Sequence, residues 1–199
     1  MQICRGNYGR LKSVSVHRAG QDHRENLELN HSGVLGCGGI NVELSSTAFV
    51  QDARIPTRFT GDGDDTSPAL AWGQVAEATR EFALICDDPD APTPEPWVHW
   101  ILLKIPGHWR LLPEGIGNHA AGSLPDGLRQ GLNSWSDGKR DCYRGPLPPP
   151  GHGVHHYHFK LYALDQPLDL PHGVTKKEVL RAIDGHVIEM TEVVGTYER

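Results

Sequence analysis

Cysteine is scarce in this sequence, with four among 199 residues. The thiols of Cys4, Cys37, Cys86 and Cys142 lie far apart and show no C-x-x-C spacing. A disulfide-held secreted domain or a zinc ribbon needs closely spaced cysteine pairs. The sequence therefore predicts reduced thiols and excludes a disulfide framework.

Long apolar runs are also missing. No stretch of about 18 apolar residues is present, which is the length that a membrane-spanning helix needs. The N-terminal sequence MQICRGNYGRLKSVSVHRAG lacks the apolar core of a secretory signal. We therefore expect a cytoplasmic protein without stable membrane insertion.

Positive charge is in short supply. Residues 1–40 hold five Lys/Arg against three Asp/Glu, and residues 41–199 hold fourteen against twenty-two, so their formal charges are +2 and −8. A duplex-binding surface needs clustered cations. We therefore expect no nucleic-acid partner.

The chain divides by composition near residue 39. Residues 1–38 mix Arg, His, Asn and Gly without a period of 2 or 3.6, so we predict a disordered N-terminal extension. Residues 39–199 are long enough for one domain with one core. Their many Gly and Pro residues indicate numerous turns, and the long connection over residues 115–153 is expected to be functional.

Three apolar segments alternate with a period of 2, which is typical of strands. In each segment one face is an apolar stripe that carries polar groups at one end. The stripes are Phe82-Leu84-Cys86-Asp88, Trp97-His99-Ile101-Leu103-Ile105, and His155-Tyr157-Phe159-Leu161-Ala163. We expect the polar ends to meet at a shared rim.

The C-terminal residues 174–199 are predicted to be helical. Thr175 and Glu178 have the spacing of a capping box, and an apolar stripe with a period near 3.6 follows, made of Val179, Leu180, Ile183 and Val187. The Asp184-Gly185 pair is expected to divide the segment into two short helices.

The polar ends of the stripes have ordinary interpretations as well as functional ones. The sequence DDPDAP can be a turn rich in Asp, and His99 can be a core histidine with a satisfied hydrogen bond. An inward carboxylate at Asp88, however, needs donors, and His99, His155 and Tyr157 can supply them. Three strands with polar ends favour a site.

Metal binding and hydrolysis fit less well. In HGVHHYHF, alternation places His155 on the face opposite His156 and His158, and no H-E-x-x-H motif is present. No G-x-S-x-G nucleophile motif is present either. We expect no metal, no cofactor and no enzyme activity, although an Asp-His pair acting as a general base remains an alternative.

Several ordered motifs resemble the phosphatidylethanolamine-binding protein (PEBP) family, in its bacterial and archaeal Raf-kinase-inhibitor-like branch. The motifs are TRFTGDGDDTSPALAW, DDPDAP followed by WVHW, GLNSW, CYRGPLPPPGHGVHHYHFKLYALD and the ending GTYER. The resemblance covers about residues 41–199. It implies a mainly β, antiparallel sandwich with C-terminal helices, a small anion pocket at one end, and a cis peptide bond before Pro92 or Pro96.

The resemblance also implies the residues of that pocket. They are Asp88, Asp90, His99, Pro149, Gly153, His155 and Tyr157. The sequence departs from the family pattern at His156, where arginine is common, and at Leu147. By alternation His156 faces away from the pocket.

The expected function is the binding of a small anion, such as phosphate, phosphoethanolamine or a carboxylate, with His99 and His155 as cationic donors. Such a protein could regulate a kinase or another signalling partner. The alternative is a protease or kinase inhibitor that acts through the loops of residues 115–153 without using the pocket. The resemblance further implies a homodimer, to which an exposed Tyr197 could contribute.

Overall fold

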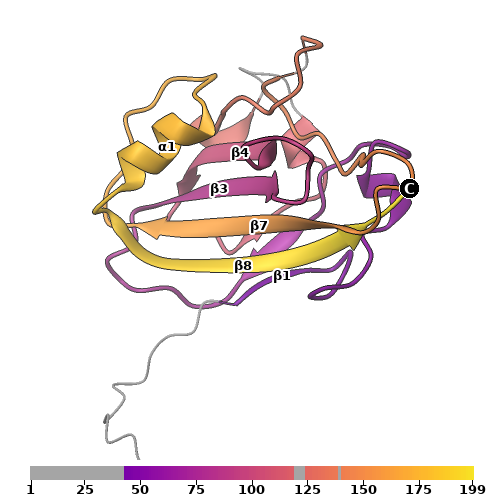
Figure 1. Cartoon of the computed structure of the whole chain (residues 1–199). Helices are drawn as coiled ribbons and strands as arrows, with labels where there is room; N and C mark the ends of the chain where they lie inside the picture. The colour runs from indigo at the N-terminus through magenta and orange to yellow at the C-terminus, as the bar shows by residue number, and fades with distance from the viewer. Residues whose placement is uncertain (1–42, 119–123, 139) are drawn as a thin grey trace, which may run out of the picture. The chain divides into compact units, whose positions relative to one another are not determined.

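Two antiparallel sheets and one α-helix make up the part of the chain that the computed structural model describes, residues 43–118, 124–138 and 140–199 (Figure 1). The small sheet has the strand order β1-β2-β5, and the large sheet has the order β6-β4-β3-β7-β8. The elements are β1 (Leu44–Ser46), η1 (Thr57–Phe59), β2 (Leu70–Trp72), β3 (Glu81–Asp88), β4 (Trp97–Pro106), β5 (Leu111–Leu112), η2 (Ile116–Asn118), η3 (Pro125–Gly127), β6 (Arg129–Gln130), β7 (His155–Leu164), α1 (Lys176–Ile183) and β8 (Val187–Tyr197). The predicted mainly β, antiparallel class is confirmed.

The predicted disordered extension, residues 1–38, lies outside the described residues. It therefore stays a prediction, as does the start of the folded domain at residue 39.

The large sheet is covered on both faces. One apolar cluster lies between the two sheets and includes Phe82 and Leu84. A second cluster lies between the large sheet and α1 and includes Ala83, Ile85 and Val179. Successive residues of β3 therefore enter different clusters, and every residue of this central strand is buried. Any polar side chain on β3 must find its partners inside the protein.

Strand β4 contains a bulge at the point where the predicted site lies. Cys86 of β3 pairs with Trp100, but the next residue, Asp87, pairs with Val98, so His99 is an extra residue in β4. A bulge interrupts the alternation of faces and re-aims the side chains beside it. Because of this bulge, the side chains of His99 and Trp100 lie on the same side of the sheet.

The predicted stripe from Trp97 to Ile105 is therefore wrong as a single face. Beyond the bulge, Trp100 and Leu102 enter the cluster between the sheets, whereas Ile101 and Leu103 enter the cluster under α1. The hydrophobic pattern alone does not reveal the bulge, because both faces of β4 are apolar here.

The N-terminal end of α1 was correctly predicted. The Glu178 N–H donates to Thr175 Oγ1 over 3.4 Å, and the Thr175 N–H donates to Glu178 Oε2 over 2.7 Å. This reciprocal capping box satisfies two amide groups at the start of the helix.

The second predicted C-terminal helix is wrong, because residues 187–197 form strand β8. The chain leaves the helix at Asp184 and turns at Gly185, whose φ of 78° favours glycine. Strand β8 then pairs antiparallel with all of β7, from Val187 opposite Leu164 to Tyr197 opposite His155. The β-branched residues of β8 suit a pleated strand, and this tertiary pairing outweighs the helical period.

Two smaller expectations are also wrong. No cis peptide bond occurs among the described residues, so the bonds before Pro92 and Pro96 are both trans. Tyr197 is buried, and its hydroxyl donates to Asp62 over 3.0 Å. The ring of Tyr197 is therefore not an exposed contact for a second subunit.

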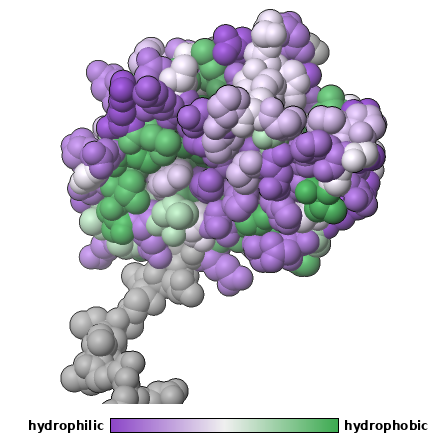
Figure 2. Space-filling model, viewed as in Figure 1, coloured by the Kyte–Doolittle hydropathy of each residue, from purple (hydrophilic) through white to green (hydrophobic). Residues whose placement is uncertain are grey.

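Hydrophobic residues on the surface gather beside α1, over the neighbouring ends of β7 and β8 (Figure 2). The exposed apolar residues of α1 and β8 are Leu180, Val187, Ile188 and Met190. Within the described residues, no helix has both the length and the apolar character needed to cross a bilayer.

We expect Gly195→Ala to destabilise the domain, because β8 crosses the 51–55 segment closely at this position. A Cβ at Gly195 would lie 2.5 Å from Ile55 Cγ1 and 2.8 Å from Phe49 Cε2, and both side chains are buried. Overpacking of this kind costs about 1–3 kcal/mol, measurable by urea unfolding. Gly73→Ala is the matched control, because its Cβ would meet nothing within 4 Å. Equal stability of the two variants would contradict this account of Gly195.

Candidate functional site

A cavity of about 220 Å³ opens where β3 ends and where β4 and β7 begin. Antiparallel pairing brings these three strand ends to one edge of the large sheet, as the sequence predicted. The cavity is lined by Asp88, Ala91, Pro92, Thr93, Trp97, His99, Trp135, Leu147, Pro148, Pro149, His155 and Tyr157.

The buried pair of Asp88 and His155 forms the polar end of the cavity. His155 Nδ1 lies 2.7 Å from Asp88 Oδ2, and the Asp90 N–H donates to Asp88 Oδ1 over 2.8 Å. An ionised carboxylate can only accept, so this contact fixes the proton of His155 on Nδ1. The remaining nitrogen, Nε2, is the one that can change its role.

A second imidazole, that of His152, is hydrogen-bonded to His155 Nε2. His152 Nδ1 lies 2.7 Å from it, and the two ring centroids are 4.9 Å apart. His152 is exposed and lies between Gly151 and Gly153, which have φ values of 75° and 88°. The contact completes a chain from a buried carboxylate through a buried imidazole to a loop imidazole.

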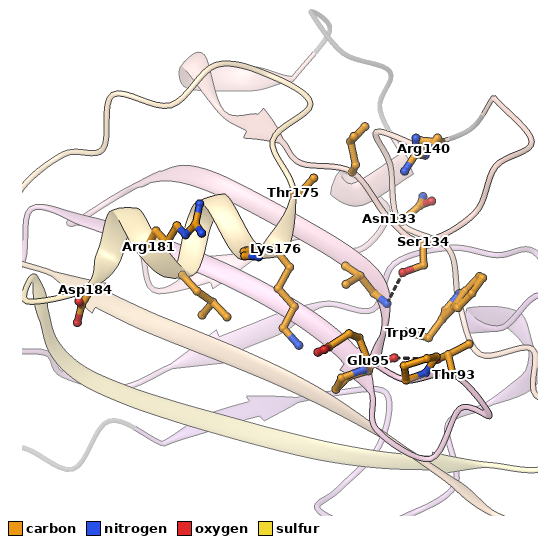
Figure 3. Close-up of a pocket in the computed structure, with 16 residues that line it drawn as sticks. Thr93, Glu95, Trp97, Asn133, Ser134, Arg140, Thr175, Lys176, Arg181 and Asp184 are labelled. Carbon is orange, nitrogen blue, oxygen red and sulfur yellow. Dashed lines mark hydrogen bonds between the residues drawn. The ribbon is translucent and has the colours of Figure 1, made fainter.

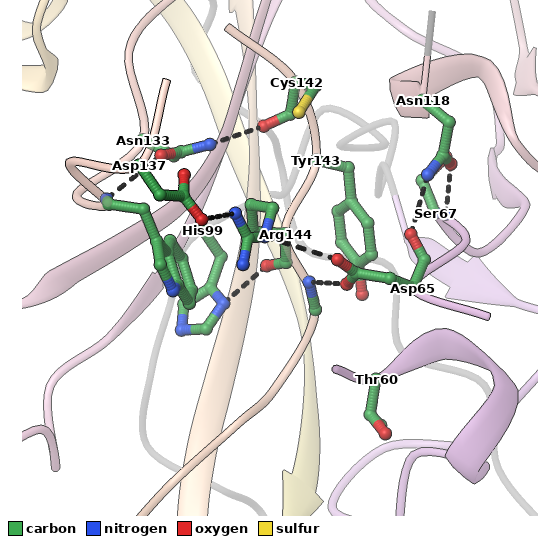
Figure 4. Close-up of polar contacts among 12 residues, drawn as sticks. Thr60, Asp65, Ser67, His99, Asn118, Asn133, Asp137, Cys142, Tyr143 and Arg144 are labelled. Atoms are coloured by element: carbon green, nitrogen blue, oxygen red, sulfur yellow. Dashed lines mark hydrogen bonds and ion pairs between the residues drawn. The ribbon is translucent and has the colours of Figure 1, made fainter. Parts of the chain in front are cut away.

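His99 is held by the neighbouring loop (Figure 4). Its Nδ1–H donates to the Arg144 carbonyl over 2.6 Å, so a neutral His99 keeps Nε2 as a hydrogen-bond acceptor. The Arg144 guanidinium in turn pairs with Asp137 at 2.7 Å and with Asp65 at 3.3 Å, and it lies over the Trp135 ring. These contacts fix the orientation of the His99 ring.

Burial keeps His99 neutral. Desolvation lowers the pKa of His99 below its ordinary value, and the carbonyl of Arg144 and the charge of Asp88 oppose this only in part. The expectation that His99 is a cationic donor is therefore wrong. The Asp88 charge raises the pKa of His99 by less than desolvation lowers it.

Tyr157 carries a hydroxyl that is buried without a hydrogen-bond partner in the described chain. Burial, followed by the charge of Asp88, raises the pKa of Tyr157, so the group is a phenol that can donate. Its ring packs edge-on against His99 with centroids 5.0 Å apart. Buried hydroxyls are normally satisfied, so the Tyr157 O–H is a donor that a molecule in the cavity could use.

The structure places the other predicted residues less uniformly. Pro149 lines the cavity. Gly153 is exposed and is not part of the lining. Asp90 lies beside the cavity, where its Oδ2 accepts from the His156 N–H over 2.9 Å and lies 2.7 Å from His156 Nδ1. His156 faces outward, as alternation predicted.

Sequence reasoning missed the lining residue Trp135, and it also missed His152, which contacts His155 without lining the cavity. The Trp135 ring packs edge-on against His99 with centroids 4.9 Å apart. Trp135 belongs to the GLNSW motif, but it lies in a loop where no period indicates its direction. In the sequence, His152 is one of several histidines near glycines, and no pattern distinguishes it as a site residue.

The described chain is thus an antiparallel β-sandwich, covered by one helix, that carries a small cavity at a three-strand edge. A family model described as phosphatidylethanolamine-binding protein matches residues 45–198. The chain therefore belongs to the phosphatidylethanolamine-binding protein family, as the sequence motifs predicted.

Similar proteins come from archaea and bacteria. A UPF0098 protein of Methanothermobacter thermautotrophicus is 46% identical over 158 residues, which are 79% of this chain and 99% of that protein. YbhB of Escherichia coli, another UPF0098 protein, is 39% identical over 162 residues, 78% of this chain and 99% of YbhB. A Mycobacterium tuberculosis protein named as a candidate lipoprotein, LppC, is 39% identical over 78% of this chain and 71% of LppC.

Solved structures agree on the fold. The crystal structure of E. coli YbcL, described as a member of the mammalian PEBP family, matches with a TM-score of 0.73 and 30% identity over 79% of this chain and 98% of YbcL. The PEBP homologue CT736 of Chlamydia trachomatis matches with a TM-score of 0.68 and 34% identity over 79% of this chain and 97% of CT736.

We expect His99 to make the stability of the domain depend on pH. Because the pKa of His99 is lower in the folded state, the unfolded chain binds the proton first, and stability falls as pH drops from 7 through the ordinary histidine range. This contribution reaches about 1.4 kcal/mol per pH unit. His99→Asn keeps a donor for the Arg144 carbonyl, and its unfolding free energy should fall less steeply between pH 7 and pH 5.

His108→Asn, at an exposed position, is the control and should keep the wild-type pH slope in urea unfolding. A His99→Asn slope equal to that of the wild type would show that His99 is not neutral in the folded protein.

Proposed function

We propose that this chain binds a small ligand with a phosphate or carboxylate group in the cavity at the edge of the large sheet. Membership of the family supports a ligand-binding or regulatory role in general. The observation that carries the specific proposal is the Tyr157 hydroxyl, which is buried without a partner in the described chain and belongs to a residue that lines the cavity.

The polar groups of the cavity suit a ligand that both accepts and donates. Tyr157 offers an O–H to an oxyanion, and His155 Nε2 offers a second donor once the imidazole takes up a proton. Neutral His99 offers an acceptor, and Asp88 supplies negative charge nearby. Phosphoethanolamine, which carries an oxyanion and an ammonium, matches this set better than inorganic phosphate does.

The expected affinity is modest. Each hydrogen bond to a charged group contributes about 1.5–3 kcal/mol, and association costs offset a large part of three or four such bonds. Dissociation constants of roughly micromolar to millimolar follow. Such values suit a sensor better than a carrier.

We propose binding without turnover. Among the described residues that line the cavity, the hydroxyl groups belong to Thr93 and Tyr157, and the raised pKa of Tyr157 makes it a poor nucleophile. A regulated kinase or other partner, a cytoplasmic location and a homodimer remain predictions. An inhibitor that acts through its loops would keep its activity when the cavity is altered.

The decisive substitution is Tyr157→Phe, which removes one hydroxyl that has no hydrogen-bond partner among the described residues. Affinity for phosphoethanolamine, measured by calorimetry, should fall about 10-fold to 150-fold, the equivalent of one hydrogen bond to a charged group. The free energy of unfolding should stay the same or rise slightly, because no hydrogen bond is lost.

Tyr143→Phe is the matched control. The Tyr143 hydroxyl is buried away from the cavity and donates to the Phe59 carbonyl over 2.7 Å. Its loss should cost about 0.5–1.5 kcal/mol of stability and leave affinity unchanged. Binding that is insensitive to Tyr157→Phe would refute this site.

His152→Ala should strengthen binding. In the unliganded protein His152 occupies His155 Nε2, so an anion that uses this nitrogen must first displace His152. Removal of one such hydrogen bond should raise affinity about 2-fold to 10-fold. His156→Ala, on the outer face of β7, should leave affinity unchanged. A loss of affinity in His152→Ala would instead make His152 a direct donor to the ligand.

A further inference from the structure

A second and larger hollow, of about 940 Å³, lies beside α1 (Figure 3). One wall is formed by α1 and its N-cap and includes Thr175, Lys176 and Arg181. The opposite wall is the loop from Thr93 to Trp97, and the segment that contains Ser134 forms the remaining side. We call this hollow the α1 groove. The groove differs from the cavity at the edge of the large sheet, which we call the anion cavity. The lining of the groove includes none of Asp88, His99, His155 and Tyr157.

The α1 groove has an apolar floor. Leu180 of α1, which the sequence placed in the apolar stripe of the helix, is 39% exposed there. Pro94, Pro96 and Leu132 extend this apolar lining around Leu180. The volume is near the upper end of the range of about 300–1,000 Å³ for ligand sites. An occupant therefore needs apolar side chains as well as charge.

The rim of the α1 groove is cationic, although the domain is acidic. Of the fourteen Lys/Arg in residues 41–199, four line the groove, against only two of the twenty-two Asp/Glu. The cations are Arg140, Lys176, Lys177 and Arg181, and the acids are Glu95 and Asp184. The lining thus carries a formal charge of +2 in a region whose formal charge is −8. Such a local reversal favours an anionic partner.

The position of Lys176 is fixed by a buried carboxylate. Asp87 pairs with Lys160 at 2.8 Å and with Lys176 on the side of the sheet that α1 covers. Burial alone would raise the pKa of Asp87, but the hydrogen bonds from the two lysines outweigh it and lower the pKa. Two lysines share one carboxylate, so the cluster keeps one net positive charge. This cluster ties the first turn of α1 to β3 and gives the groove a rigid wall.

Two cations on the exposed side of α1 are available to a partner. Lys177 and Arg181 are exposed and are four residues apart, so they lie on one side of the helix with Leu180 between them along the chain. Neither side chain is hydrogen-bonded within the described residues, and Arg181 interacts electrostatically with the exposed Glu178 carboxylate. A peptide with carboxylates and a leucine-sized side chain at helical or extended spacing matches this arrangement.

We propose that the α1 groove docks an acidic segment of a partner protein, with apolar side chains over Leu180 and carboxylates against Lys177 and Arg181. The chain's own N-terminal residues are a poor occupant, because residues 1–40 carry a formal charge of +2. A nucleic acid is also a poor occupant, since the four lining cations are too few for a phosphate track and Trp97 is the one aromatic side chain among the described lining residues. The α1 groove and the anion cavity share the lining residues Thr93 and Trp97, but the cations and Leu180 that carry the proposal line only the groove.

The experiment uses the full chain and short fluorescein-labelled peptides. The probes are a peptide of alternating Glu and Leu, its Lys/Leu counterpart, a peptide of residues 1–38, and a single-stranded oligonucleotide, each titrated by fluorescence anisotropy. The Glu/Leu peptide should bind, and its affinity should fall with added salt. Lys177→Glu combined with Arg181→Glu should lower that affinity about tenfold or more, and Leu180→Asn should lower it as well.

Arg80→Glu combined with Arg110→Glu is the matched control, because both arginines are exposed outside the groove and the change in formal charge is the same. This variant and Tyr157→Phe should bind the Glu/Leu peptide with an affinity within about twofold of the wild type. Equal losses in the groove and control variants would overturn the proposal, since they would indicate only nonspecific charge attraction. Absence of Glu/Leu binding, or tighter binding of any of the other three probes, would also overturn it.

Discussion

Two consecutive carboxylates in a strand without access to water set the arrangement of both hollows. Asp87 and Asp88 end β3, which is buried on both faces, so alternation sends each carboxylate into a different interior layer. Neither charge can remain there unpaired, because desolvation costs several kcal/mol per ion. Asp88 therefore requires His155 at the start of β7, and Asp87 requires Lys160 together with Lys176 of α1. The first pairing builds the cavity, and the second fixes the wall of the α1 groove.

The sequence correctly predicts side-chain direction only for those site residues that lie on regular strands. Strand β7 has no irregularity between His155 and Tyr157, so a period of 2 correctly places both side chains on the face that Asp88 shares. The same rule correctly places His156 outside. At His99 the rule gives the right neighbourhood, but the stripe beyond it is wrong because a bulge inserts one residue, and apolar side chains on both faces conceal the shift.

The remaining features depend on contacts between distant segments, which no local pattern encodes. Residues 187–197 have both a helical apolar period and a high content of β-branched residues. Hydrogen-bonded pairing with the edge of β7 stabilises the strand over the helix. Trp135 reaches the cavity and His152 reaches His155 from loops, where side-chain direction has no period. The charge state of His99 depends on its burial, which lowers its pKa. The sequence shows aspartates in a nearby motif, which would raise the pKa, but it does not show how deeply the ring is buried.

The loop between β3 and β4 lines both hollows, since Thr93 and Trp97 belong to each. A ligand in one hollow affects the other only by as much as it changes the conformational equilibrium of this shared wall, and the effect is equal in both directions. Pro92, Pro94 and Pro96 each fix a φ angle, and the Thr93 hydroxyl donates to the Glu95 carbonyl over 2.7 Å. A wall restrained at so many positions has few alternative states to populate. The stiffness of this loop therefore favours two sites that share residues but bind independently, so that substitutions in one should have additive effects with substitutions in the other.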